Sequence, residues 1–134
     1  MIVSHRHRFV FIKTQKTAGT SVEIGLSAHC GPDDVITAVQ EERLRREAGG
    51  RGPQHDLLPL LQYRRGDVVA ALRDRRRVHL VAHTSAIRAR RLLGRRSWDD
   101  YFTFTIERNP WDKMISAYYW WMQKRERPWP TITE

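Results

Sequence analysis

The sequence predicts an α/β fold with a parallel sheet and crossover helices, on three observations. Short apolar or β-branched runs occur at residues 9–12, 78–82 and 101–106. A helical pattern follows each run, and the order strand, helix, strand indicates parallel pairing through crossover helices. The loop after the first run is rich in small, hydroxyl and basic residues, as in loops that bind anions at a helix N-terminus.

Length and composition favour one domain over residues 1–134, with 40% hydrophobic residues. No apolar run approaches the ~20 residues of a membrane helix, so we expect no membrane span. The basic start leads straight into the first strand, and we expect no signal peptide. The single cysteine, Cys30, excludes an intramolecular disulfide and suits a reducing compartment. We therefore expect a cytoplasmic protein.

The chain carries a formal net charge of +9, with 24 basic and 15 acidic residues. This balance predicts an anionic partner: nucleic acid, a polyanionic glycan or a multiply charged nucleotide. Arginine dominates and lies in three clusters, at residues 43–51, 73–77 and 88–96. We interpret the clusters as solvated helix faces, which makes nucleic acid the less favoured partner.

The first strand, residues 9–12, precedes the loop and a helix whose apolar face begins with Val22 and Leu26. The first amides of that helix have no intrahelical partner, and the helix dipole is positive there. Gly19 would let the backbone approach a ligand, while Lys16 adds a mobile charge. These features predict a phosphate- or sulfate-binding loop and, with the strand order, a P-loop-like three-layer fold.

The order of residues in this loop differs from that in the loops of nucleotide-hydrolysing proteins. A Walker motif places Lys directly after its last Gly and then a Ser or Thr that holds magnesium. Here Lys16 comes three residues before Gly19, so the strict motif fails. The order Lys-Thr-Ala-Gly-Thr-Ser after an apolar strand resembles the 5′-phosphosulfate loop of sulfotransferases.

The remaining elements follow in order. Asp33 or Asp34 would cap a short helical piece that leads to residues 41–46, and residues 48–53 form a surface loop. A helix at residues 67–72 would be capped near Gly66 or Asp67. After the second strand, Thr84 or Ser85 would cap a helix that Gly94 ends. After the third strand, Asn109 would cap, and Pro110 begin, an aromatic helix over about residues 111–123.

Three chemistry-bearing residues follow the three predicted strands: Lys16, His83 and Arg108. In parallel sheets ligands bind beyond the carboxyl ends of the strands. We therefore expect the three residues to share one site.

A second motif makes the resemblance specific: Arg108-Asn109-Pro110-Trp111-Asp112, with Ser116 in the following helix. The chain resembles a sulfotransferase of the carbohydrate (type 2-like) group over most of residues 9–121. The resemblance implies transfer of a sulfuryl group from 3′-phosphoadenosine-5′-phosphosulfate to an acceptor hydroxyl, on a glycan or another small molecule, without a metal. The residues that it assigns to the 5′-phosphosulfate are Lys16, Thr17, Ala18, Gly19, Thr20 and Ser21. It assigns Arg108 and Ser116 to the 3′-phosphate, and Lys16 also to stabilising the leaving group.

An acceptor hydroxyl needs a general base, and His83 is the first candidate because its pKa is near neutral and it follows a strand. His55 and Glu23 are weaker candidates, and we interpret Glu23 as a surface acid near the helix dipole. The aromatic run at residues 118–121, with Trp129 beyond, would be partly core and could partly stack on a sugar.

Family members normally continue beyond the aromatic helix, so we expect a truncated member or one completed by another chain. Two other functions stay open: a P-loop nucleotide kinase or NTPase, and a non-catalytic basic module that binds polyanions or nucleic acid. A relic of the fold that binds the nucleotide without transferring sulfate is a further possibility.

Overall fold

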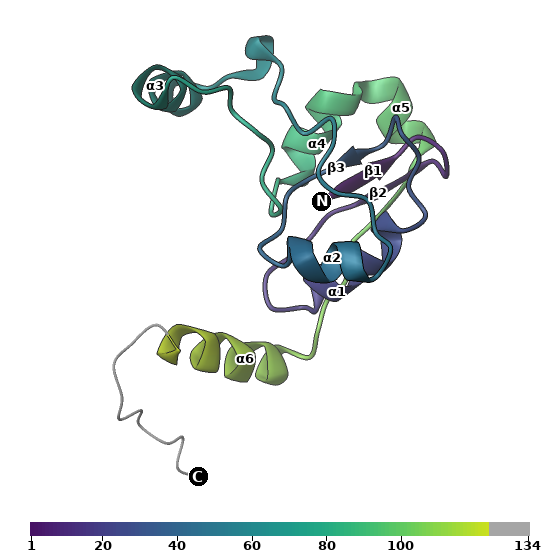
Figure 1. The fold of residues 1–134 in the computed structure, drawn as a ribbon, viewed down its shortest axis with the longest axis vertical. Coiled ribbons are helices and arrows are strands. Elements are labelled where there is room, and N and C mark those ends of the chain that lie inside the picture. The colour runs from purple at the N-terminus through teal and green to yellow at the C-terminus, as the bar shows by residue number, and fades with distance from the viewer. Residues whose placement is uncertain (124–134) are drawn as a thin grey trace.

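The computed structural model describes residues 1–123 (Figure 1). In that range it has four short strands, six α-helices and one 3₁₀ turn. The strands are β1 (Ile2–Ser4), β2 (Phe9–Phe11), β3 (Val35–Ile36) and β4 (Phe102–Phe104). The helices are α1 (Gly19–Ser27), α2 (Glu42–Glu47), α3 (Arg65–Asp74), α4 (Ala86–Leu93), α5 (Arg95–Asp100) and α6 (Pro110–Met122), with the 3₁₀ turn η1 at Leu60–Gln62.

The four strands form one mixed sheet in the order β3-β1-β2-β4. β2 and β4 are parallel, with Phe9 opposite Phe102 and Phe11 opposite Phe104. β1 runs antiparallel to both β2 and β3. The α/β class is thus confirmed, whereas the expectation of a wholly parallel sheet is wrong.

The predicted strand at residues 78–82 does not join this sheet. It makes one isolated antiparallel bridge, between His79 and Leu57. The N–H of Leu80 donates to the carbonyl of Asp56, and the N–H of Val78 donates to the Tyr63 hydroxyl. The segment therefore pairs with the irregular chain at residues 56–58, and β1 and β3, which the pattern did not predict, form the other half of the sheet.

Side chains alternate between the two faces of the sheet and form two cores. Val3 and Val10 pack in one core with Ala89 and with the half-buried Trp98, from α4 and α5. Ile2, Phe11 and Ile36 form the other, against Val22 and Leu26 of α1. The sheet accordingly lies between α4–α5 and α1–α2 (Figure 1).

The helix signals around α4 and α6 are confirmed, whereas two other expected caps are wrong: Arg64 caps α3 in place of Gly66 or Asp67, and Asp34 leads into β3 and caps no helix. The Ser85 hydroxyl accepts a hydrogen bond from the N–H of Arg88 at the start of α4, and Gly94 ends that helix with φ 77°. The Asn109 side chain accepts from the N–H of Trp111, and Pro110 is the first residue of α6. These caps work through residues two or three positions away, which is why the sequence reveals them.

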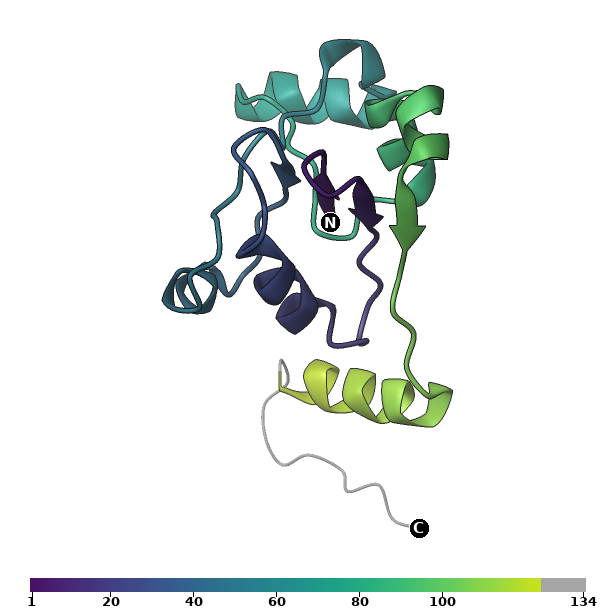
Figure 2. The same ribbon diagram turned by 90° about the vertical axis from the view of Figure 1, so that its right-hand side faces the viewer.

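Two helices, α3 and α6, stand away from the sheet (Figures 1 and 2). Both expose large apolar side chains, among them Leu72 on α3 and Trp111 and Trp121 on α6. In residues 1–123 no helix is long and apolar enough to cross a membrane.

Candidate functional site

The loop between β2 and α1 has an unusual backbone and leads into a helix without a side-chain cap. Lys16 and Ala18 both adopt left-handed conformations, with φ 60° and 57°. The first intrahelical hydrogen bond of α1 runs from the N–H of Val22 to the carbonyl of Ala18 (3.3 Å), and no side chain caps the helix. The amides of residues 19–21 therefore lack intrahelical acceptors, as required of groups that would bind an anion.

Hydrogen bonds tie the base of this loop to the chain that leaves β4. The N–H of Ile12 donates to the carbonyl of Phe104 (2.9 Å), and the Thr14 hydroxyl donates to the carbonyl of Ile106 (2.8 Å). The buried Thr17 hydroxyl lies 2.9 Å from that of Thr14. The two segments that follow the parallel strands thus run side by side, and one of them leads to Arg108.

His83 lies against the same loop, although no sheet strand carries it there. Its Nδ1 is 3.2 Å from the carbonyl oxygen of Lys13. A carbonyl only accepts hydrogen bonds, so this contact requires the proton on Nδ1 and leaves Nε2 of the neutral ring as the basic nitrogen. His83 as a whole residue is exposed.

Arg108 and Ser116 lie beyond the end of β4. Arg108 is exposed and makes no hydrogen bond or ion pair with any residue in the range 1–123. Its neighbour Glu107 pairs instead with Lys113 at 3.0 Å. Ser116 is half-buried in α6, and among the described residues no hydrogen bond joins it or Arg108 to the loop.

Helix α6 meets the loop through an aromatic ring. The Lys16 ammonium lies 4.1 Å from the centroid of the Trp120 ring, a cation–π contact. Figure 2 shows α6 lying beneath the loop and α1. Of the aromatic residues proposed to stack on a sugar, Trp120 thus contacts the predicted catalytic lysine, and Trp129 lies outside the described residues.

The other two candidate bases occupy different places. His55 is exposed, and its Nε2 lies 3.0 Å from the carbonyl of Pro32, with no hydrogen bond to the loop. Glu23 is fully buried, so its interpretation as a surface acid is wrong. Its carboxylate binds Lys13 Nζ at 3.0 Å and the Met1 ammonium at 2.8 Å, which keeps it from any acceptor.

Arg45 departs from the expectation of solvated arginine clusters, because it is fully buried. Its Nη1 donates to Glu42 and to the carbonyl of Thr37, and its Nη2 lies 3.6 Å from Glu23. Gly50 makes room for it: a Cβ there would lie 2.8 Å from Arg45 Cγ. Two of its partners, Glu23 and the Thr37 carbonyl, lie outside α2, so the helical pattern of residues 41–46 alone gives no sign of its burial.

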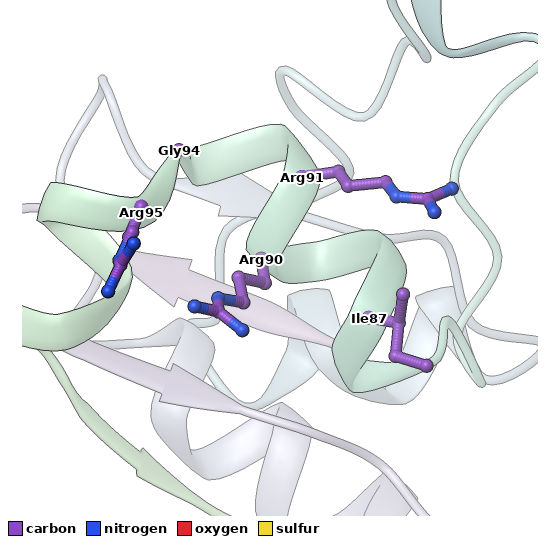
Figure 3. A pocket seen from close by; sticks show the side chains of 5 residues that line it. All are labelled: Ile87, Arg90, Arg91, Gly94 and Arg95. Atoms are coloured by element: carbon purple, nitrogen blue, oxygen red, sulfur yellow. The ribbon is translucent and has the colours of Figure 1, made fainter.

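An open cavity of about 370 Å³ lies elsewhere, on α4 and α5 (Figure 3). Its lining is Ile87, Arg90, Arg91, Gly94 and Arg95, none of them a predicted site residue. Within residues 1–123 no group of three or more His, Cys, Asp or Glu side chains could hold a metal ion.

Comparison of the chain with protein-family models, with curated proteins and with solved structures finds no match.

Proposed function

We propose that this chain is a sulfotransferase domain with a P-loop-like fold, which binds 3′-phosphoadenosine-5′-phosphosulfate and transfers its sulfuryl group to an acceptor hydroxyl, on a glycan or another small molecule. The observation that carries the proposal is the loop between β2 and α1, with its uncapped amides at residues 19–21 and Lys16 beside them.

The donor set suits a molecule with two anionic ends. At one end, the amides of α1 and the hydroxyls of Thr20 and Ser21 would hold the 5′-phosphosulfate. Lys16 would stabilise the charge that develops on the leaving oxygen, a role worth about 10²–10³ in rate for one donor. At the other end, the exposed Arg108 fork and the Ser116 hydroxyl would hold the 3′-phosphate.

His83 would act on the acceptor. With Nδ1 bound to the Lys13 carbonyl, Nε2 is available to take the proton of the attacking hydroxyl. The acceptor oxygen gains the bond to sulfur, the bond from sulfur to the phosphate oxygen breaks, and 3′,5′-adenosine bisphosphate leaves. The nucleotide supplies the activated sulfuryl group, and the protein residues orient it and receive the proton.

Calorimetric titration with 3′,5′-adenosine bisphosphate, without magnesium, tests the proposal. We expect micromolar binding, weakened about tenfold or more by Lys16→Ala and by Arg108→Ala, since one charge-assisted hydrogen bond is worth roughly 1.5–3 kcal/mol. Arg96→Ala, at an exposed arginine of α5, is the control and should bind as the wild type does. Equal affinity in the Lys16 variant, or tighter binding of ATP with magnesium, would refute it.

A second candidate is a module that binds nucleic acid, favoured by Arg90, Arg91 and Arg95 around one cavity. Figure 3 shows Arg90 and Arg95 extending to the same side of the α4–α5 corner. Such a module would bind oligonucleotides with a steep salt dependence, lose affinity in Arg90→Ala and be indifferent to Lys16→Ala.

A further inference from the structure

A buried ionic cluster lies behind the loop. It comprises Glu23 of α1, Lys13, Arg45 of α2, Thr37 and the Met1 ammonium. Glu23 is at its centre: Oε1 accepts from the Met1 ammonium (2.8 Å) and the Thr37 hydroxyl (3.0 Å), and Oε2 accepts from Lys13 Nζ (3.0 Å). Both carboxylate oxygens therefore accept hydrogen bonds from groups inside the protein.

The charges of the cluster make Glu23 hard to replace. Its single carboxylate faces three basic groups, on Met1, Lys13 and Arg45. Glu42 neutralises Arg45 from the outer, partly exposed side. A buried ion pair adds little stability over well-packed apolar side chains, whereas a buried charge that loses its partner is costly. A gain in stability therefore does not explain the cluster well. The contacts that it makes with the loop suggest a role in positioning.

Lys13 connects Glu23 with the loop. The side chain of Lys13 runs beneath Gly19, the first residue of α1, so closely that a Cβ at Gly19 would lie 2.8 Å from Lys13 Cγ. The carbonyl of the same lysine accepts the hydrogen bond of His83. One residue thus contacts the carboxylate, the start of α1 and the candidate base.

Met1 gives a second connection to His83. Its ammonium contacts Glu23 and also donates to the carbonyl of Ala82, the residue before His83 (2.9 Å). Glu23 is therefore linked to the histidine through Met1 and through Lys13, without contacting it.

We propose that Glu23 is a positioning residue of the candidate site. Through Lys13 it holds the loop and the uncapped amides of α1, and through Lys13 and Met1 it holds His83. The proposal rests on the proposed function for its catalytic meaning. The restraint itself can be measured without a ligand.

Glu23→Gln tests it, with Glu42→Gln as the matched control, because Glu42 contacts Arg45 but neither Lys13 nor Met1. We expect Glu23→Gln to speed amide hydrogen exchange at residues 13–21 and 82–84 at least tenfold, while the amides of β1 and β2 stay protected. It should also weaken binding of 3′,5′-adenosine bisphosphate about tenfold. Glu42→Gln should leave exchange at these residues and the nucleotide affinity unchanged.

The tautomer of His83, that is, which ring nitrogen carries the proton, is a second measurement, and a general loss of stability would not change it. Nitrogen NMR of the wild type should show the proton on Nδ1, because the Lys13 carbonyl accepts it. Glu23→Gln should remove that preference, and Glu42→Gln should keep it. His83→Gln assigns the signal among the six histidines.

If Glu23→Gln does not fold, the double variant Lys13→Met with Glu23→Leu removes both charges of one pair and replaces them with apolar side chains. We expect it to fold and to show the same faster exchange and the same loss of the Nδ1 tautomer. Wild-type exchange and tautomer in either folded variant would overturn the positioning role. A wild-type chain that binds no nucleotide would refute only the proposed function, since exchange and tautomer still decide the role of Glu23.

Discussion

Two glycines of helix α1 provide a sharp test of how the loop is packed. A Cβ at Gly19 would lie 2.8 Å from Lys13 Cγ and 3.5 Å from its Cδ and Cε, while a Cβ at Gly25 would meet nothing within 4 Å. Lys13 cannot easily move aside, because its Nζ is held by the buried Glu23. Glycine is therefore required at position 19 because the Lys13 side chain packs against it.

The expected magnitudes follow from these distances. Replacing a helical glycine by alanine is worth about 0.5–1 kcal/mol where space permits, so Gly25→Ala should stabilise the protein by that amount. Gly19→Ala gains a similar backbone contribution but overpacks a constrained site, at a cost of about 1–3 kcal/mol. The free energies of unfolding of the two variants should thus differ by about 1–3 kcal/mol, with Gly19→Ala the less stable.

Urea denaturation followed by far-UV circular dichroism measures both values, and unchanged m-values would show that the same structure unfolds. A Gly19→Ala protein as stable as Gly25→Ala would refute the packing of Lys13 beneath α1. The positioning of the loop by Glu23 would then lose one of its supports.

Three further predictions concern titratable groups. Burial, with the Asp34 carboxylate beside it, raises the pKa of the Cys30 thiol to about 12. An alkylating reagent at pH 8 should therefore label Cys30 only when the protein unfolds. Rapid labelling of the native chain would contradict this prediction. Burial opposes ionisation of Asp34, but backbone N–H groups and the Ser4 hydroxyl hold its pKa below the ordinary value. Stability from Asp34 should therefore be lost as pH falls below about 4, and Asp34→Asn should remove that part of the acid transition in a pH series of thermal melts. Burial lowers the pKa of the Met1 ammonium from 8.0 to about 6 despite Glu23. The unfolded chain then holds more protons between these values, so the free energy of unfolding should rise from pH 6 to pH 8, by up to about 3 kcal/mol; a flat or falling urea series would contradict it.

The parts of the fold that depend on near neighbours in sequence were predictable. The strand, loop and helix over residues 9–26 and the caps at Ser85, Asn109 and Gly94 rest on residues a few positions apart. The two parallel strands, β2 and β4, were also found, because each is an apolar run bounded by polar residues.

The rest depends on distant partners. β1 is three residues long and precedes a basic turn, and β3 has two residues, so neither forms a periodic pattern. The run at residues 78–82 has the composition of a strand, but its partner is the irregular chain near Leu57. Propensity describes how a segment fits beside neighbours that the sequence does not identify.

The candidate site divides in the same way. The position of Lys16 and the unpaired amides of α1 follow from the local sequence. The proximity of His83 to the loop was expected from the strand order, but contacts with Lys13 and Met1 hold this segment there instead. The burial of Glu23 was missed because its partners lie 10 to 22 residues away. A usable sign was present, since the buried face of α1 is Gly19, Glu23 and Ser27, an acid between two small residues at helical spacing.

The contact between Lys16 and Trp120 also has a practical use. An ammonium 4.1 Å from an indole perturbs its excited state, so the emission of Trp120 depends on where Lys16 lies. An anion that draws Lys16 towards the loop amides would change that emission without any label. The difference between the spectra of the wild type and Trp120→Phe isolates this indole from the other four tryptophans and turns it into an optical sensor of loop occupancy.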